Sequence, residues 1–508
     1  MKVLFLSSRS ASVLLDPSGD YRLRAPLSVS LNGQPLPVQE RSVCSLYHLK
    51  PDTDYLLSAW RDGEEAEQIA FRTLKESVSL DVRRFGAVGD GIHDDTAALQ
   101  AAILSCPRDG RVRVPAGTYL TGPLFLKSHM TLELQYNAVF ALHTDRSRFP
   151  ILPGTTFTED GEFLLGSWEG NPLDCFASAL TGLEVEDVRI IGEGVIDGQA
   201  QKGDWWVHPK ERRGAYRGRL LYLRGCSNVA VQGITFRNSP AWNLHPTFSE
   251  NLLFCDIAVE APANSPNTDG FDPESCSHVR VYGARFSVGD DCVAIKSGKI
   301  YMGSHYKTPC QDLEIAWSAM LDGHGGVTIG SEMAGGVQDV HVHHCWMRGN
   351  DRGLRVKTRR GRGEQGVIDR ICFSDVRMES VKTPLVINSM YFCDPDGHSD
   401  FVQSRDPHPV DRTTPAIGEI VFERVLATDC QTCVAYLLGL PERPIRKVSL
   451  LDCQFSFSPD AQPSVPAMAE GVPAISRQGI IAHFVSLLRQ EQVEIIGLDP
   501  SASVHPDG

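Results

Sequence analysis

The sequence predicts an all-β chain in which parallel strands coil into a solenoid, preceded by a small β-sandwich. Short stretches with apolar residues two apart, the periodicity of a strand, recur from Val188-Arg-Ile to Val448-Ser-Leu. Between Val229 and Ile371 they recur every 23 to 34 residues, and no helical pattern lies between them. Each repeat is long enough for one coil of parallel strands and too long for a hairpin ladder. A β-sandwich with a hidden period is the minor alternative.

The sandwich is expected to occupy residues 1–78. Strand-like stretches at residues 27–31, 42–46 and 69–73 are separated by turn signals, of which Asn32-Gly33 is typical of a tight hairpin. The run Leu49-Lys-Pro-Asp-Thr-Asp-Tyr55 resembles part of the fibronectin type III sandwich, where the Tyr is a packing element. This unit is interpreted as a packing module, with carbohydrate binding or substrate shaping as the alternative.

The solenoid is expected to occupy residues 79–508 and to need a cap at its open end. Asp94-Asp95-Thr96 offers capping side chains, and residues 97–104 combine helix formers with an apolar stripe. This pattern predicts a helix that covers the first coil. Residues 461–508, with an apolar stretch at 479–488, are expected to form a C-terminal cap or to complete the final coils.

Composition excludes several classes of function. The chain of 508 residues has 49 Lys and Arg against 63 Asp and Glu, a net charge of −14, which argues against general nucleic-acid binding. No apolar run is long enough to span a membrane. The apolar run at residues 3–6 fits a first strand better than a signal peptide. The 14 cysteines are scattered, with one lone CxxC at Cys430 and Cys433, so we expect buried thiols in a cytoplasmic protein; a periplasmic or secreted location is less favoured.

Four polar clusters lie on adjacent predicted coils and carry the chemistry. Asp290 and His324 each lie 11 residues after the start of their strand stretch, while Asp269 and Lys357 each lie 17 residues after theirs. Because neighbouring parallel strands are about 4.8 Å apart, equal offsets place such side chains in one patch. The clusters are Asn267-Thr-Asp-Gly270, Gly289-Asp-Asp291, Gly323-His-Gly325 and Arg355-Val-Lys357.

Carboxylates gathered in this way are costly as structure, because like charges repel and push their pKa values apart. Glycoside hydrolysis requires such a group: a protonated acid for the leaving oxygen and an ionised base for water. Each cluster alone is more readily explained as a turn, since Asp and Asn are common turn residues. Four clusters in register favour a catalytic site.

These motifs resemble those of the polygalacturonases, the pectin hydrolases of glycoside hydrolase family twenty-eight. The resemblance covers residues 80–460 and implies a right-handed parallel β-helix and an inverting hydrolysis of α-1,4-galacturonosidic bonds that uses neither metal nor other cofactor. The partner it implies is a galacturonate-containing poly- or oligosaccharide. Further matching stretches are Phe85-Gly-Ala-Val-Gly-Asp-Gly91, Gly192-Glu-Gly-Val-Ile-Asp-Gly198 and Asn238-Ser-Pro-Ala-Trp-Asn-Leu-His-Pro246.

The resemblance also implies a role for each site residue. Asp290 resembles the general acid, Asp269 and Asp291 the pair that activates water, and His324 the residue that supports protonation of the acid. Arg355 and Lys357 resemble the groups that hold a galacturonate carboxylate, which suits a guanidinium fork and an ammonium charge. Asn267, in the first motif, and Tyr391, in a looser match, are assigned to substrate binding.

Other side chains have competing interpretations. His341 and His343 are expected to face one way along a strand and His344 the other, which argues against a metal site. Trp242 and His245 suit either packing or the rim of the substrate site. Six cations between Arg352 and Arg362 predict a locally basic surface for an acidic sugar.

Exo-action is preferred to endo-action. Residues 143–178 form a long insertion between coils, and long loops are often functional; with the N-terminal sandwich, this resembles bacterial exo-polygalacturonases. The alternatives are a rhamnogalacturonan- or xylogalacturonan-cleaving hydrolase of the same family, a pectate lyase, and a non-catalytic carbohydrate-binding solenoid. The sequence assigns no oligomeric state.

Overall fold

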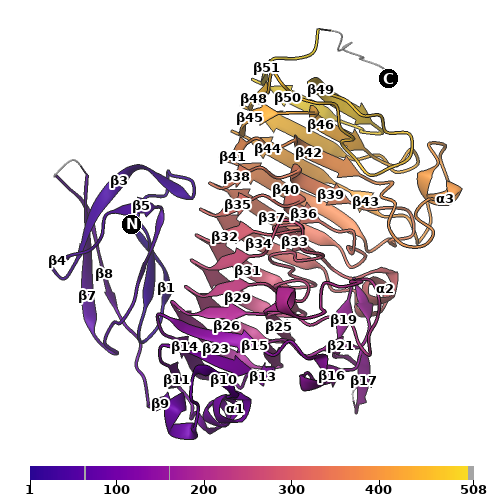
Figure 1. Cartoon of the computed structure of the whole chain (residues 1–508). Coiled ribbons are helices and arrows are strands. Elements are labelled where there is room, and N and C mark those ends of the chain that lie inside the picture. Colours follow the sequence, from indigo (N-terminus) through magenta and orange to yellow (C-terminus); the bar gives the residue numbers. More distant parts are fainter. Residues whose placement is uncertain (62–63, 160, 501–508) are drawn as a thin grey trace.

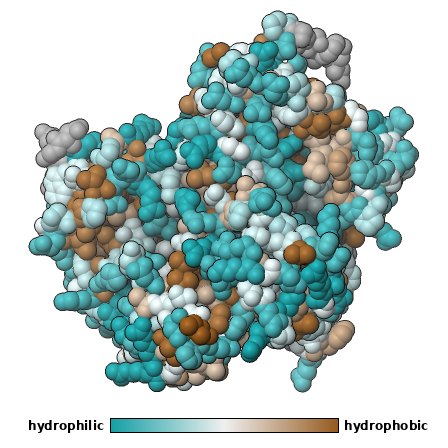
Figure 2. All heavy atoms as spheres, in the orientation of Figure 1, coloured by the Kyte–Doolittle hydropathy of each residue, from teal (hydrophilic) through white to brown (hydrophobic). Residues whose placement is uncertain are grey.

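The computed structural model describes residues 1–61, 64–159 and 161–500. A small antiparallel sandwich lies beside a long solenoid, which the chain ascends from the α1 end to the β51 end (Figure 1). Within these residues no helix has the length and apolar character needed to span a membrane. The face drawn in Figure 2 is mainly hydrophilic, because the large apolar side chains of the solenoid point inward into one continuous core.

The sandwich consists of two sheets. One contains β1 (Lys2–Leu6), β2 (Ala11–Leu14) and β6 (Val43–Leu46); the other contains β3 (Arg22–Leu31), β4 (Gln34–Pro35), β5 (Gln39–Arg41), β7 (Asp54–Arg61) and β8 (Glu64–Arg72). Asn32 and Gly33 both have positive φ and close the β3–β4 hairpin, as their sequence predicts. Tyr55 stacks on Phe71, and its hydroxyl accepts a hydrogen bond from the Lys50 N–H at 2.8 Å.

The solenoid is a right-handed parallel β-helix with three sheets, which we call sheets I, II and III in the order that each coil visits them. Sheet I contains β9 (Ser79–Asp81), β11 (Gly110–Val114), β14 (Met130–Leu134), β23 (Glu186–Gly192), β26 (Ser227–Gln232), β29 (Glu250–Cys255), β31 (Ser277–Tyr282), β34 (Cys310–Ala316), β37 (Val337–His343), β40 (Val367–Ser374), β43 (Ala416–Ile417), β44 (Glu419–Glu423), β47 (Lys447–Leu451) and β50 (Leu488–Glu491). Sheet II contains β10 (Asp90–Asp94), β12 (Gly117–Thr121), β15 (Ala138–Leu142), β24 (Val195–Asp197), β27 (Thr235–Arg237), β30 (Ala258–Glu260), β32 (Arg285–Ser287), β35 (Ala319–Leu321), β38 (Trp346–Arg348), β41 (Arg377–Glu379), β45 (Leu426–Cys430), β48 (Gln454–Phe457) and β51 (Glu494–Ile496).

Sheet III is divided into two parts, and the division positions the candidate site. The first part contains β13 (Leu124–Phe125), β22 (Leu180–Leu183), β25 (Leu221–Arg224) and β28 (Leu244–Thr247); the second contains β33 (Val293–Ile295), β36 (Gly325–Ile329), β39 (Arg352–Lys357), β42 (Thr383–Asn388), β46 (Cys433–Leu438) and β49 (Gln478–His483). Between them, Phe271 and Glu274 continue the ladder only as single bridges.

The predicted repeat is confirmed residue by residue. Beginning at Val188, each apolar stretch pairs in register with the next, and the first residues of all nine stretches lie opposite one another through to Val448 on sheet I. These first residues are buried in the interior. The period of the sequence is therefore the period of the coils.

The ends and the insertion add the remaining elements. The predicted first helix is α1 (Thr96–Ser105), which lies at the open end of the solenoid and buries Leu99 and Ile103 there (Figure 1). Asp95 does not cap it with its side chain; the Asp95 carboxylate accepts the N–H groups of Val88 and Gly89 instead. Other short helices are α2 (Ile300–Tyr306), α3 (Asp400–Gln403), η1 (Val82–Phe85), η2 (Arg146–Arg148) and η3 (Ala200–Lys202). The insertion carries β16 (Ile151–Leu152), β17 (Thr155–Thr158), β18 (Gly161–Leu164), β19 (Ser167–Trp168), β20 (Asn171–Pro172) and β21 (Cys175–Phe176).

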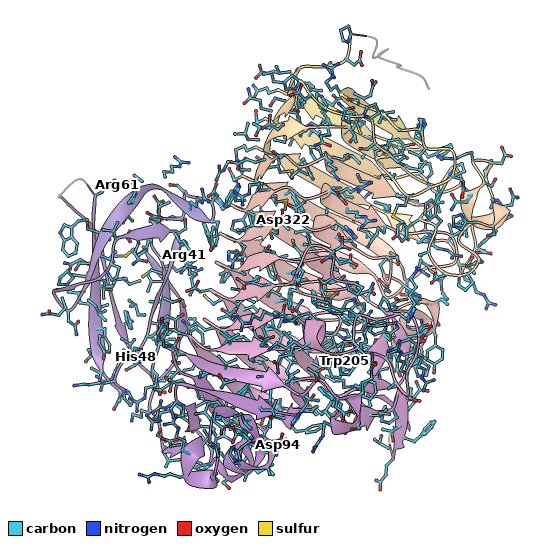
Figure 3. The ribbon with its side chains drawn as sticks, viewed as in Figure 1. Arg41, His48, Arg61, Asp94, Trp205 and Asp322 are labelled. Carbon is cyan, nitrogen blue, oxygen red and sulfur yellow. The ribbon has the colours of Figure 1, made fainter. Side chains whose placement is uncertain are left out.

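Ion pairs connect the sandwich to the solenoid at several places. Arg41 contacts Asp256 at 2.5 Å, and His48 contacts Glu193 at 3.3 Å (Figure 3). Arg377 on β41 contacts Asp20 of the sandwich at 2.8 Å. These contacts fix the sandwich against the corner between sheets I and II.

Candidate active site

The predicted catalytic residues meet where coils turn from sheet II into sheet III. Asp269 comes just before the bridge residue Phe271, Asp290 and Asp291 come just before β33, and His324 comes just before β36. A strand that begins in register with its neighbours leaves the residues before it stacked as well. The site thus consists of turn residues carried on a rigid ladder.

Backbone hydrogen bonds fix this stacking. The Gly270 N–H donates to the Asp291 carbonyl at 3.0 Å, and the His324 N–H donates to the Asp290 carbonyl at 3.0 Å. Asp290 and His324 therefore lie opposite each other on adjacent coils, as their equal offsets predict. Asp269 lies opposite Asp291 on the adjacent coil, whereas Lys357 lies further along its strand. The equal offsets of Asp269 and Lys357 therefore do not place these two residues at the same register position. The loop that precedes Asp269 makes its coil longer.

The three aspartates form one compact group. One carboxylate oxygen of each lies within 4.8 Å of the others. Their side chains differ in exposure: 22% for Asp290, 6% for Asp269 and 1% for Asp291. Asp290 is therefore the most solvent-accessible carboxylate of the three.

Charge neighbours push the two buried carboxyls in opposite directions. Burial and the nearby Asp290 and Asp272 raise the pKa of Asp269 well above its usual range. Burial also disfavours ionisation of Asp291, but Lys357 at 2.9 Å and Arg355 at 3.4 Å outweigh it and hold its pKa well below the usual range. Such divergent pKa values are characteristic of acid–base sites.

His324 faces Asp290, with Nδ1 3.3 Å from Oδ1. The hydrogen bond to Asp290 outweighs burial and raises the pKa of the imidazole. Glycines flank His324 for steric reasons. Gly323 has a φ of +82°, and a Cβ on Gly325 would lie 2.7 Å from an oxygen of Asp291.

A segment near the C-terminus covers the cationic pair. The Arg355 and Lys357 cations lie 5.7 and 5.5 Å from the ring of Tyr391. Arg355 Nη2 contacts Met468 Sδ at 3.1 Å, and the Asn388 amide donates to the Met468 carbonyl at 2.9 Å. The structure thus brings Tyr391 to the predicted cations, and part of the expected C-terminal cap lies over them.

A second charged group beneath the aspartates was missed by sequence reasoning. Lys296, buried, lies 3.8 Å from Asp269, 3.4 Å from Asp272 and 3.5 Å from Glu332. Burial, moderated by Lys296, raises the pKa of Asp272 to about 8, whereas Lys296 and Lys299 overcome burial to lower that of Glu332 to about 2. The available signal was spacing: Asp272 follows Asp269 by three residues, and Lys296 ends the Gly289–Lys296 stretch.

Aromatic and cationic side chains wall the site on the side of the insertion. Trp168 of β19 stacks between Trp242 and Tyr216, with centroid distances of 6.0 and 5.0 Å. Arg219 lies over Trp168 and Trp242, and Lys296 lies 4.5 Å from the Trp242 ring centroid. The insertion is therefore linked to the aspartates through Trp242 and Lys296.

Two predicted polar residues are engaged by neighbouring side chains. Asn267 Oδ1 accepts from Arg217 at 2.7 Å, an interaction that orients the turn before Asp269. His245 is fully buried 3.0 Å from Glu274, and burial lowers its pKa to about 4. Of the two earlier interpretations of His245, packing fits this geometry. Trp242 is also buried, but it contacts Lys296.

Two expectations from the sequence are wrong. Arg359, Arg360 and Arg362 do not present a basic surface; they are buried and paired with Asp396, Glu442 and Asp394. His344 does not face away from His343, because β37 ends at His343 and a positive φ turns His344 back to 2.9 Å between the two Nδ1 atoms.

The aspartate group is also the one place among the described residues where three carboxylate or ring ligands converge closely enough for a cation. Both oxygens of Asp291 are already in contact with Arg355 or Lys357, and Lys296 lies beside Asp269. These three protein cations already balance the group, so its donor set fits a divalent metal poorly.

Comparison with known proteins identifies the family of this chain. The family model described as Glycosyl hydrolases family 28 matches residues 111–406, and a model described as Rhamnogalacturonase A/epimerase, pectate lyase-like matches residues 79–133. The "Probable polygalacturonase" of Vitis vinifera is 32% identical over 82% of each chain.

Two solved structures resemble the fold. A hyperthermoactive exopolygalacturonase from Thermotoga maritima is 25% identical, covers 82% of this chain and 92% of its own, and gives a TM-score of 0.64. A family 28 exopolygalacturonase from Yersinia enterocolitica is 18% identical, covers 99% and 98%, and gives 0.69. The family model covers more than half of the chain, and the catalytic motifs lie inside it: this chain belongs to the glycosyl hydrolases of family 28.

Proposed function

We propose that this glycoside hydrolase cleaves α-1,4-galacturonosidic bonds in polygalacturonate or oligogalacturonides. The observation that carries the proposal is the contact of Arg355 and Lys357 with the carboxylate of Asp291, because it places two cations beside the catalytic carboxyls. A galacturonate carboxylate would find both charge and a guanidinium fork there. The polygalacturonase relatives support the same substrate class.

Asp290 acts as the general acid in this proposal. It is the most exposed of the three carboxyls, and an acid must reach the glycosidic oxygen. The carboxyl with the raised pKa is Asp269, so the free enzyme holds a proton mainly on Asp269. An acid role for Asp290 alone would instead place that proton on Asp290. Interacting carboxyls titrate as a set, and His324 supplies a further proton 3.3 Å from Asp290.

Asp291 and Asp269 activate the attacking water. Asp291 is held ionised by its cations, and Asp269 offers a second oxygen beside it for the same water. Asp290→Asn should lower kcat on a galacturonate trimer by about 10²–10⁴-fold. Asp339→Asn, an exposed ion-pair position on β37, serves as the matched control; near-normal turnover in Asp290→Asn would exclude Asp290 as the acid.

Inversion of the anomeric centre is part of the proposal and has its own test. The nearest oxygens lie within 4.8 Å, while acid and base in inverting enzymes are typically about 6.5–9.5 Å apart. We nevertheless favour inversion, because both oxygens of Asp291 are already in contact with Arg355 and Lys357, which suits a carboxylate that orients a water better than one that attacks the sugar itself. Proton NMR of the first product anomer decides: β-galacturonate supports inversion, and α-galacturonate refutes it.

Exo-action is supported by walls on both sides of the aspartates. The insertion contacts the coils beside them, since Ser167 donates to Glu274 at 2.9 Å and Gly170 accepts from Lys299 at 2.8 Å. On the other side, Met468 and Tyr391 lie over the cations. We infer that these walls restrict the passage of a polymer past the aspartates. Monomer or dimer as the first product from polygalacturonate is expected; an early ladder of mixed oligomers contradicts exo-action.

The second candidate function is cleavage of rhamnogalacturonan or xylogalacturonan. It is favoured by the rhamnogalacturonase-type match at residues 79–133. Activity on those polymers without activity on polygalacturonate would select it. Unsaturated products absorbing in the ultraviolet would instead indicate a lyase.

We further propose a cytoplasmic location, where short oligogalacturonides would be the substrate. All 14 cysteines have free thiols, and 12 of these residues are buried, which fits a reducing compartment. Cell fractionation tests this; recovery of the enzyme outside the cytoplasm would contradict it.

A further inference from the structure

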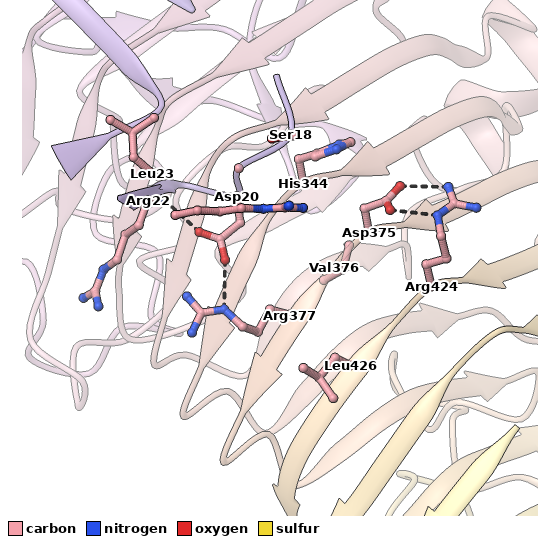
Figure 4. A pocket seen from close by; sticks show the side chains of 12 residues that line it. Ser18, Asp20, Arg22, Leu23, His344, Asp375, Val376, Arg377, Arg424 and Leu426 are labelled. Carbon is pink, nitrogen blue, oxygen red and sulfur yellow. Dashed lines mark hydrogen bonds and ion pairs between the residues drawn. The ribbon is translucent and has the colours of Figure 1, made fainter. Parts of the chain in front are cut away.

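A polar cleft lies between the sandwich and the solenoid, away from the catalytic aspartates. Its volume is about 720 Å³, within the range of sites for small ligands. One wall is the segment from Ser18 to Arg24, and the other is formed by corner residues of three successive coils, beginning at His344, Asp375 and Arg424 (Figure 4).

Three guanidinium groups crowd one side chain beside this cleft. The guanidinium carbons of Arg22, Arg348 and Arg377 lie 4.0, 5.0 and 5.2 Å from the ring centroid of Trp346. Only Arg377 has carboxylate partners, Asp20 and Glu379. In the described part of the chain, Arg22 and Arg348 have none, so no carboxylate balances their charges, which lie over the ring of Trp346.

Arg24 adds a further free cation. It lines the cleft, is exposed, and pairs with no carboxylate of the described residues. Of the other lining arginines, Arg377 pairs with Asp20 and Arg424 is held at 2.8 Å by both oxygens of Asp375 (Figure 4). The ion-paired side chains hold the walls of the cleft in place. Within the residues that the structure describes, the guanidinium groups of Arg22 and Arg24 have no carboxylate partner, so their N–H donors are available to a ligand at the opening of the cleft.

We propose that this cleft is a second binding site for the carboxylates of an oligogalacturonide, separate from the catalytic site. Guanidinium groups bind carboxylates through paired N–H donors. The chain carries a net charge of −14, but charges further away than about 8–10 Å are largely screened, so the unpaired cations at the cleft attract a polyanion locally. The choice of a galacturonate ligand rests on the proposed function; the excess of unpaired cations does not.

The cleft does not belong to the catalytic groove. It opens at the corner between sheets I and II, whereas the aspartates lie at the corner between sheets II and III. The three-residue strand β38 lies between these corners and alone spans about 10 Å. A chain held in the cleft would raise the local concentration of substrate ends at the active site.

Binding stoichiometry tests the proposal. In the Asp290→Asn protein, calorimetric titration with a galacturonate trimer should show two bound molecules per chain. Arg24→Ala, and separately Arg348→Ala from the solenoid side, should remove or weaken the second equivalent at least tenfold and leave the first unchanged. The retained first equivalent shows that each variant is folded. Lys50→Ala/Arg72→Ala, which removes two exposed cations of the same sandwich outside the cleft, should keep both.

Inorganic phosphate at matched ionic strength separates a sugar site from a general anion site. Retention of the second equivalent in phosphate supports the proposal, and its displacement by phosphate as readily as by galacturonate overturns it. A single equivalent in Asp290→Asn also overturns it while leaving the proposed function intact. No binding at all would refute both.

Discussion

Replacing Lys296 by Met tests whether the buried charges under the aspartates act as one unit. Lys296 is the cation common to Asp269, Asp272 and Glu332, at 3.4–3.8 Å from each. Met keeps the length and apolar stem of the side chain and removes only the charge. The pKa of Glu332 is held at about 2 chiefly by Lys296 and Lys299 against burial, so Glu332 is the carboxylate most affected.

The cost follows from the geometry. Breaking a buried pair by removing one partner costs about 3–5 kcal/mol, because the other charge stays buried. Unfolding entropy of about 2.1 cal/mol/K per residue gives about 1.1 kcal/mol/K for 508 residues. The melting temperature should therefore fall by about 3–5 °C. Lys447→Met removes the half-exposed partner of Glu419 and should cost about 1 °C or less.

A pH series distinguishes charge from packing. Glu332 has a folded pKa below its unfolded value, so its stabilisation is present above about pH 4.5 and is lost as the pH falls toward 2. In Lys296→Met, burial is opposed by fewer cations, so the pKa of Glu332 rises and the carboxyl protonates at a higher pH than in the parent protein. Calorimetry should show a deficit at pH 7.5 that is less than half as large at pH 4. An equal deficit at both values, or one no larger than that of Lys447→Met, would refute the charge argument.

Other predictions concern single groups. The pKa of His324 is raised by Asp290, so kcat/KM on a galacturonate trimer should fall as the pH rises through the pKa of His324. His324→Asn should lower kcat and remove this fall at alkaline pH. An unchanged pH profile in His324→Asn would show that another group causes the fall. Asp272, with a pKa of about 8, keeps a proton in the folded state that the unfolded state releases, so it weakens stability as the pH rises from about 4 to 8; Asp272→Asn should flatten the melting temperature over this range, and an undiminished slope would contradict the assignment. Galacturonate binding near pH 4 should be accompanied by proton uptake, seen as dependence of the calorimetric enthalpy on buffer ionisation; a buffer-independent enthalpy would contradict it.

Periodicity was sufficient to predict the solenoid because each coil obeys the same local rule. A strand that faces an apolar interior repeats apolar residues two apart, and stacking forces equal positions of successive coils into register. Val188 and Val448 thus belong to one column. The same rule placed Asp290 level with His324, because both follow short, regular turns from sheet II.

Long side chains and long loops escape that rule. Lys357 reaches Asp291 from further along its strand because its stem is flexible, and Met468 reaches Arg355 from a segment 113 residues away. Which arginines of residues 352–362 face the site depends on partners such as Glu442, distant in sequence. These contacts are made by tertiary packing, and no local pattern encodes them.

Proton uptake is expected when galacturonate binds because Arg355 and Lys357 contact Asp291 in the free enzyme and would also bind the galacturonate carboxylate. In the free enzyme, Arg355 and Lys357 are bound to Asp291 and depress its pKa, which makes Asp291 ionised but a weak base. A galacturonate carboxylate that takes over part of these contacts leaves Asp291 less compensated and adds a like charge nearby, and both effects raise its pKa. The base therefore gains strength when the substrate arrives, which is when a water must be activated. Arg355→Met should weaken galacturonate binding and reduce the uptake together; a variant that lost affinity but kept full uptake would show that the proton goes to another group.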